Sequence, residues 1–164
     1  MREESCARVF SLDDCVALRE EARSLGKVVV LTNGCFDLLH RGHLDYLEHS
    51  AGLGDLLIVA VNSDESVRAL KGDSRPLNPA VDRVHALGCL RFVDAAFIFQ
   101  GLRLMDEIRA LRPDIYTKAG DYTLGSLDSS EREALQEVGS AIRIQPLSEG
   151  YSTTSLAERL HTSS

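Results

Sequence analysis

The sequence has no excess of basic residues and no long apolar run, and both absences exclude classes of partner. Its 18 Lys and Arg stand against 25 Asp and Glu, a formal net charge of −7, so it lacks the basic surface that binds nucleic acid. No apolar stretch approaches the roughly 18 residues of a membrane span, and the charged start of the chain has no signal-peptide core. We therefore expect a cytoplasmic protein with neither a nucleic-acid partner nor a membrane partner.

The chain also lacks any C-x-x-C pair, repeat, linker or low-complexity tract. Its cysteines are scattered, at Cys6, Cys15, Cys35 and Cys89, which argues against a zinc knuckle or a disulfide framework and favours reduced thiols. At 164 residues with 44% hydrophobic content, the chain has the size of one ordinary domain. A single domain over residues 1–164 is the prediction.

Short apolar runs alternate with amphipathic stretches along the chain. The runs predict strands at 28–31, 56–61, 95–99, 114–117 and 141–144, the first followed by the turn-prone Thr32-Asn33-Gly34. Helical spacing predicts helices near 12–25, 41–51, 79–91, 103–111, 129–138 and 153–161. Such alternation indicates an α/β fold, namely a doubly wound, Rossmann-like domain with a five-stranded parallel sheet and helices on both faces.

The segment after the first strand carries the chemistry, because ligands of such sheets bind beyond the carboxyl ends of the strands. Gly34 lets the backbone approach a ligand closely, and His43 lies near a helix N-terminus, which favours an anion. His40 and His43, three positions apart, project to similar sides. Both imidazoles can donate hydrogen bonds to one phosphoryl group, as nucleotidyl transfer requires, with Mg²⁺ assisting.

Two other interpretations of these histidines have to be weighed. A lone histidine is more often a capping or packing residue, and a metal site would need a third ligand, which the neighbouring sequence does not offer. No metal ligand from the protein is therefore predicted, and Mg²⁺ is expected to be held mainly by the phosphates of the nucleotide.

The whole segment Asn33-Gly34-Cys35-Phe36-Asp37-Leu38-Leu39-His40-Arg41-Gly42-His43 resembles the G-x-F-D-x-x-H-x-G-H signature of the cytidylyltransferase-like nucleotidyltransferases. This resemblance implies that His40 and His43 contact the phosphates of the nucleotide and the transition state. It also implies that the nucleotide is bound by the start of the segment, at Asn33, Gly34, Cys35 and Phe36.

Later strings resemble the heptose 1-phosphate adenylyltransferases of lipopolysaccharide-precursor synthesis. They are A-V-N-S-D, L-K-G-D-S-R-P-x-N-P, Lys118-Ala119-Gly120-Asp121-Tyr122 and Gly150-Tyr151-Ser152-Thr153-Thr154, so the likeness covers a catalytic core of about 27–160. One departure is Ala119, where this family usually has a glycine, and its effect on the nearby nucleotide site stays open.

The second resemblance implies roles for further residues. Lys118 would neutralise charge that develops during the reaction, and Asp121 would orient the nucleotide or the sugar. The hydroxyls of Ser152, Thr153 and Thr154 would bind the β- and γ-phosphates. Binding of the substrate or its phosphate would fall to Asp37, Lys71, Arg75 and Arg83.

The expected activity is transfer of AMP from ATP to D-glycero-D-manno-heptose 1-phosphate, giving ADP-heptose and pyrophosphate. The expected cofactor is Mg²⁺, the expected partners are small molecules, and a separate sugar kinase would supply the acceptor. Alternatives are a GTP-dependent heptose 1-phosphate guanylyltransferase, a glycerol 3-phosphate cytidylyltransferase and a non-catalytic nucleotide-binding module. The sequence decides neither the base, nor the anomer of the sugar phosphate, nor whether the chain forms a homodimer.

Overall fold

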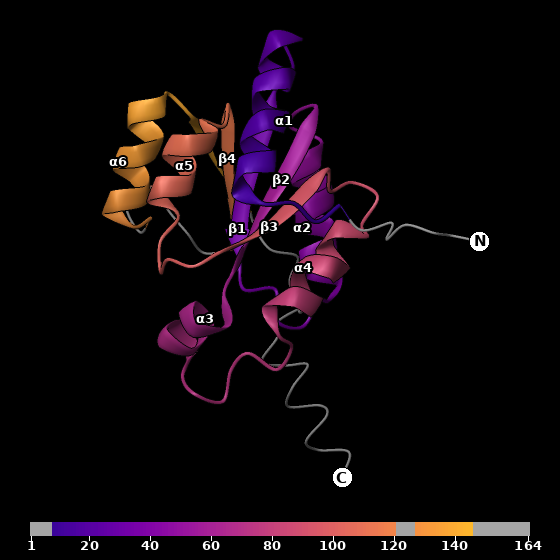
Figure 1. Ribbon diagram of the computed structural model, residues 1–164, viewed down its shortest axis with the longest axis vertical. Helices are drawn as coiled ribbons and strands as arrows, with labels where there is room; N and C mark the ends of the chain where they lie inside the picture. Colours follow the sequence, from indigo (N-terminus) through magenta and orange to yellow (C-terminus); the bar gives the residue numbers. More distant parts are fainter. Residues whose placement is uncertain (1–7, 121–126, 146–164) are drawn as a thin grey trace, which may run out of the picture.

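The computed structural model describes residues 8–120 and 127–145. Within them helices and strands alternate (Figure 1) in the order α1 Leu12–Ser24, β1 Val29–Gly34, α2 Arg41–Ala51, β2 Leu56–Asn62, α3 Asp64–Lys71, α4 Ala80–Gly88, β3 Ala95–Phe99, α5 Met105–Leu111, β4 Ile115–Ala119, α6 Ser129–Val138 and β5 Ala141–Gln145. In these described parts no helix is long and apolar enough to cross a bilayer.

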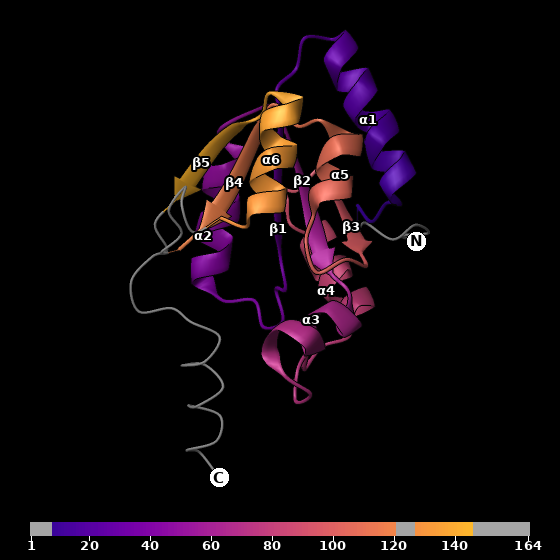
Figure 2. The ribbon, with the colours of Figure 1, turned by 90° about the vertical axis from the view of Figure 1, so that its left-hand side faces the viewer.

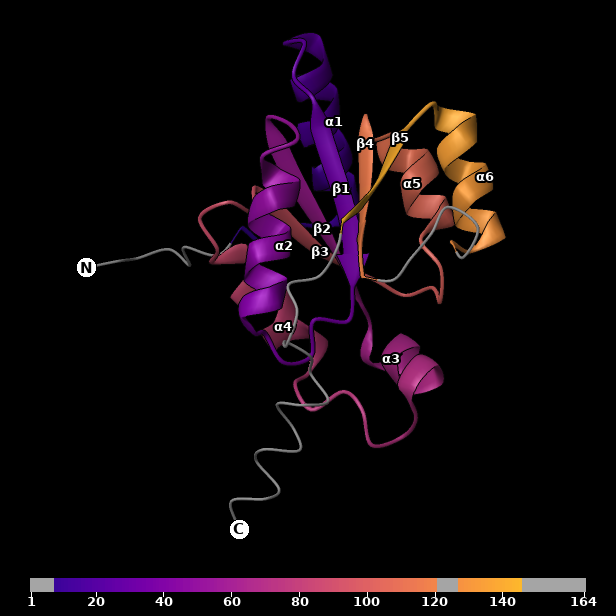
Figure 3. The ribbon, with the colours of Figure 1, turned by 180° about the vertical axis from the view of Figure 1, so that it is seen from behind.

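The five strands form one parallel sheet in the order β3-β2-β1-β4-β5. Helices α2 and α4 pack on one face, and α1, α5 and α6 pack on the other (Figure 3). Helices α5 and α6 lie side by side along β4 (Figure 2). The predicted doubly wound, Rossmann-like fold is therefore confirmed.

The central strands are fully buried because helices cover both faces of the sheet. Val30, Leu57 and Val59 belong to the core under α2 and α4, whereas Leu31 and Ile58 belong to the core under α1, α5 and α6. Successive residues of a strand point to opposite faces. The continuous apolar runs of the sequence follow from this double burial.

Two strands extend further than the sequence predicted. The predicted turn Thr32-Asn33-Gly34 is wrong, because β1 runs through Gly34 and pairs there with Val61 of β2. Strand β4 likewise runs through Ala119, so Lys118 lies within the strand and not after it. Polar residues continue these strands because neighbouring strands and buried partners satisfy their hydrogen bonds.

Helix α3 is absent from the sequence prediction. The side chain of Ser63 accepts a hydrogen bond from the Ser66 backbone N–H and so caps its N-terminus. Only Ser66 and Val67 of this eight-residue helix are buried, which leaves too little apolar periodicity to detect. The predicted helix at 79–91 is shorter, Ala80–Gly88, and the one at 153–161 lies outside the described residues.

Candidate functional site

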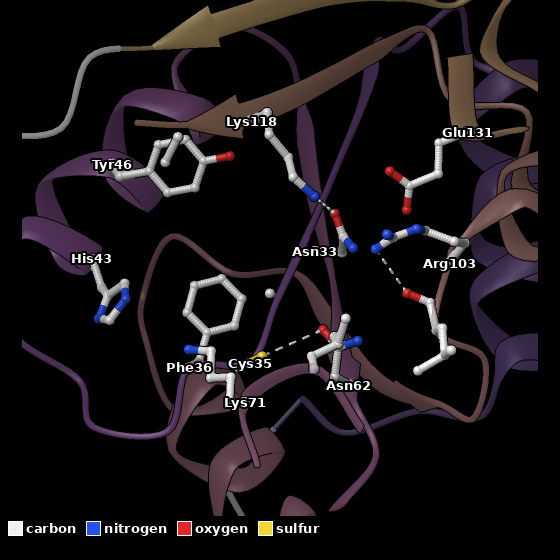
Figure 4. Close-up of a pocket in the computed structure, with 14 residues that line it drawn as sticks. Asn33, Cys35, Phe36, His43, Tyr46, Asn62, Lys71, Arg103, Lys118 and Glu131 are labelled. Carbon is white, nitrogen blue, oxygen red and sulfur yellow. Dashed lines mark hydrogen bonds between the residues drawn. The ribbon is translucent and has the colours of Figure 1, made fainter. Parts of the chain in front are cut away.

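A cavity of about 430 Å³ lies at the carboxyl ends of β1, β2 and β4. From β1 the chain proceeds through β2 to β3 and then returns through α5 to β4 on the other side of β1. The loops that follow β1 and β4 therefore diverge, which is where such sheets bind ligands. The residues around the cavity (Figure 4) are Asn33, Gly34, Cys35, Phe36, His43, Tyr46, Asn62, Leu70, Lys71, Leu102, Arg103, Lys118, Ala119 and Glu131.

The two motif histidines stack at the beginning of α2. His40 occupies the N-cap position without a capping hydrogen bond from its side chain, and its ring lies 3.8 Å from that of His43, centroid to centroid, at 24°. The ring of Phe36 meets His43 edge-on at 5.4 Å. His43 lines the cavity, so an anion bound there would meet an imidazole and a helix N-terminus together.

Both histidines are uncharged at neutral pH. Burial, the neighbouring His40 and Lys71 lower the pKa of His43 to about 4, although the Leu38 carbonyl acts in the opposite direction. Burial also lowers the pKa of His40. The Nδ1 atoms of both rings are buried and have no hydrogen-bond partner within the described residues. These two nitrogens are closed to solvent as the rings lie, so a ligand that contacts the pair does so through other ring atoms.

A buried hydroxyl cluster fixes the orientation of α2. Tyr46, one turn after His43, places its hydroxyl 2.7 Å from Thr32 Oγ1 and donates to Thr117 Oγ1 at 3.0 Å. The Ser50 hydroxyl lies 3.0 Å from the same Thr117 Oγ1. These bonds join α2 to β1 and β4, so the helix that carries His43 is held by two of the strands that border the cavity.

Strands β1 and β4 also place a lysine at the cavity. Lys118 donates a hydrogen bond to Asn33 Oδ1 at 2.9 Å, and the Tyr116 hydroxyl donates to the same oxygen at 2.7 Å. Burial lowers the pKa of Lys118, as does the nearby Arg103, whereas Glu131 and Cys35 raise it. Because Asn33 Oδ1 is engaged by these donors, the amide nitrogen of Asn33 is directed toward the cavity.

Gly34 makes room for a side chain of its own loop. A Cβ at this position would lie 2.9 Å from Cε2 of Phe36, and Phe36 itself has a positive φ of 48°. The glycine therefore permits the aromatic ring to fold back beside His43, in addition to the close backbone approach that the sequence suggested.

The predicted substrate-binding residues Asp37, Arg75 and Arg83 do not line this cavity and form hydrogen bonds with other parts of the chain. Asp37 accepts hydrogen bonds from Arg75 Nη1 at 2.8 Å and from the backbone N–H groups of Leu77 and Asn78. Arg83 is 2% exposed and donates to the Cys35 carbonyl, to the Asn78 carbonyl and to the carboxylate of Asp64. These contacts hold the segment after α3 against the loop after β1.

Asp37 and Arg83, with Phe36, Leu39, Asn78, Asp82 and Ala86, line a separate cavity of about 270 Å³. Of the predicted substrate-binding residues, Lys71 alone lies at the larger cavity. The predicted residues Asp121, Ser152, Thr153 and Thr154 lie outside the described residues. Among those that are described, no cluster of three or more His, Cys, Asp or Glu side chains could hold a metal ion.

Sequence reasoning missed four polar residues of the larger cavity: Tyr46, Asn62, Arg103 and Glu131. Asn62 ends the second apolar run, and Arg103 follows the third, so the rule that functional residues follow strands could have found both. Glu131 carries no such signal, because an acidic residue in the first turn of a helix is ordinarily exposed to solvent.

Acidification is expected to destabilise the protein through His43. Its pKa is about 4 in the folded chain against 6.5 for the free side chain. Its contribution to stability is therefore complete above about pH 6.5 and lost as the pH falls toward about 4. Between neutral pH and about pH 5, the wild type should lose about 2 kcal/mol more unfolding free energy than His43→Asn in urea titrations. Equal losses in both proteins would contradict this assignment.

Comparisons with known proteins identify the family of this chain. A model of the Cytidylyltransferase-like family matches residues 31–159. A protein of Koribacter versatilis (strain Ellin345) named "Bifunctional protein HldE" is 42% identical over 155 residues, which are 94% of this chain and 32% of that protein. The protein of the same name from Methylococcus capsulatus is 46% identical over 138 residues, or 84% and 29% of the two chains. This chain thus spans about a third of the length of these relatives.

A solved structure is also similar. The lipopolysaccharide core biosynthesis protein from Thermoplasma volcanium GSS1 aligns with a TM-score of 0.62 at 29% sequence identity, covering 77% of this chain and 100% of that chain. The family match includes the stacked histidines, the hydroxyl cluster beneath them and Lys118. The chain therefore belongs to the cytidylyltransferase-like family and is a nucleotidyltransferase.

Proposed function

We propose that this nucleotidyltransferase transfers AMP from ATP to D-glycero-D-manno-heptose 1-phosphate. An oxygen of the sugar phosphate attacks the α-phosphorus of ATP, the bond from that phosphorus to the oxygen bridging to the β-phosphate breaks, and pyrophosphate leaves. ADP-heptose is the second product. The observation that carries the proposal is the stacked pair of imidazoles at the N-terminus of α2, of which His43 lines a cavity that Lys71 and Lys118 also line.

The charges of the site suit this transfer. Neutral imidazoles and the backbone N–H groups at the start of α2 donate hydrogen bonds to phosphate oxygens whose charge grows in the transition state. Lys71, at the end of α3, lines the same cavity as His43 and lowers its pKa, so both side chains contribute to a site for the phosphates of the nucleotide. Because a bound phosphate also favours the protonated imidazole, binding itself would raise the pKa of His43.

Mg²⁺ is part of the proposal as a companion of the nucleotide. The proposed ion is carried by the triphosphate and keeps several of its waters. When bound, it would neutralise charge on the nucleotide phosphates. Support for the heptose acceptor comes from the sequence strings around Lys71 and Lys118 and from the similarity to a lipopolysaccharide core biosynthesis protein.

A panel of substrates tests the proposal. Pyrophosphate release is measured with ATP, CTP, GTP and UTP, each with α- or β-heptose 1-phosphate or glycerol 3-phosphate, in the presence of Mg²⁺. We expect release with ATP and a heptose 1-phosphate, and its loss on chelation of Mg²⁺. A preference for GTP would indicate a guanylyltransferase, and a preference for CTP with glycerol 3-phosphate a cytidylyltransferase. Nucleotide binding without any release would indicate a binding module.

A further inference from the structure

The end of the cavity away from His43 is lined by side chains of both charges, Arg103 and Glu131 (Figure 4). Figure 4 shows His43 on one side of the cavity and Arg103 on the other, with Asn33 between them in this view. The side chains of Arg103, Glu131 and Asn33 point toward one another. Around His43 the charged side chain is Lys71, whereas here a guanidinium and a carboxylate share the wall of the cavity.

The Arg103 guanidinium is held by an ion pair with Asp128. Its Nε donates to Asp128 Oδ2 at 2.8 Å, and Nη1 makes a long contact of 3.5 Å with the Leu102 carbonyl. Its Nη2 has no hydrogen-bond partner within the part of the chain that the structure describes. The ion pair engages Nε and leaves the outer edge of the guanidinium available to a ligand in the cavity.

Glu131 is held in the same way. It is 4% exposed, and its Oε1 accepts a hydrogen bond from the Leu104 backbone N–H at 3.0 Å. Its Oε2 makes no hydrogen bond with any other described residue, so this oxygen is available as an acceptor. Arg103, Glu131 and Lys118 line the same cavity, and both Arg103 and Glu131 affect the pKa of Lys118.

The three groups together offer donors and an acceptor to one ligand. Arg103 and the amide of Asn33 supply N–H donors, and the free oxygen of Glu131 supplies an acceptor. A phosphate has no hydrogen to donate to a carboxylate and would be repelled by it. A hydroxyl group both accepts and donates, so a polyhydroxylated ring satisfies this set.

We infer that Arg103 and Glu131, with the amide of Asn33, bind the ring hydroxyls of the acceptor sugar. This inference rests on the proposed function, because it requires a sugar phosphate as the acceptor. The phosphate of that sugar then lies toward His43 and the nucleotide, and its ring extends toward the loop between β3 and α5. Arg103 and Glu131 thus determine which phosphorylated acceptor is used.

Steady-state kinetics of Arg103→Lys and Glu131→Gln test the inference, with heptose 1-phosphate and ATP each varied in turn. Lysine keeps the charge but not the fork of the guanidinium, and glutamine keeps an oxygen for the Leu104 N–H. We expect each variant to raise the KM for heptose 1-phosphate about tenfold or more, while the KM for ATP changes by less than about twofold, since a site built for a hydroxyl discriminates through that bond.

Arg109→Lys is the matched control for Arg103→Lys. Its Nε donates to Glu137 at 2.7 Å and its side chain is 41% exposed, against 46% for Arg103, but Arg109 does not line the cavity. This variant should leave both KM values unchanged.

Three results would overturn the inference while the proposed function stands. A raised KM for ATP with an unchanged KM for heptose 1-phosphate would assign the hydroxyls to the ribose of the nucleotide. An unchanged or lower KM for heptose 1-phosphate in Glu131→Gln would mean that Arg103 binds phosphate. Normal kinetics in both variants would leave the two residues without a substrate role. A wild-type enzyme that uses no sugar phosphate overturns the proposed function instead, and the subsite with it.

Discussion

Replacing His43 with asparagine is expected to lower kcat about 10²–10³-fold, the usual cost of removing one preorganised donor from a charged transition state. His43 lines the cavity, stacks on His40 and faces the charge of Lys71. Asparagine retains a donor but is too short to reach the same point. Pyrophosphate release with saturating ATP and heptose 1-phosphate measures the effect.

His49→Asn is the control for this variant. His49 is exposed in the last turn of the same helix, so the same substitution there should leave kcat within about twofold, as is usual for surface changes. A kcat in His43→Asn that matches that of His49→Asn would remove His43 from the reaction. A raised KM for ATP with an unchanged kcat would assign His43 to binding of ATP in the ground state.

The order of the elements could be predicted because it follows from local patterns. Continuous apolar runs such as 56–61 indicate strands buried on both faces, and helical spacing predicts the first helix near 12–25, which the structure shows at Leu12–Ser24. The strand ends could not be predicted in the same way. Thr32 and Asn33 have the composition of a turn, yet they continue β1 because Tyr46, Tyr116 and Lys118 supply hydrogen bonds from elsewhere in the chain.

The candidate site likewise has a part that the sequence could predict and a part that it could not. The stacked histidines lie within one short motif, so their proximity could be predicted from spacing. The environment that sets their chemistry could not, because it comes from residues far apart in sequence, such as Lys71 and Arg103. Charge type alone also does not reveal the partners of a side chain: Arg75 and Arg83, which the sequence predicts to bind the substrate or its phosphate, pair with carboxylates at 2.8 and 2.7 Å.

Replacing Asp37 with asparagine is expected to lower the free energy of unfolding by about 3–5 kcal/mol, because it removes one partner of a buried ion pair. The Asp37 side chain is 2% exposed and pairs with Arg75 at 2.8 Å. Burial alone would raise the pKa of Asp37, but the N–H groups of Asn78 and Leu77 and the Arg75 guanidinium outweigh it and lower that pKa. Asparagine would present an N–H donor to a guanidinium. Urea titration measures the loss.

Glu48→Gln is the matched comparison, because Glu48 pairs with Arg91 at 2.6 Å while both side chains are 55% or more exposed. Exposed pairs contribute about 1 kcal/mol or less, so a similar loss in both variants would contradict the argument from burial. Kinetics at low temperature, where Asp37→Asn stays folded, then separate two roles of this carboxylate. Lost stability with an unchanged KM for the acceptor makes Asp37 a support that ties the loop after β1 to Arg75. A raised KM with unchanged stability makes it a ligand of the substrate, as the sequence first suggested.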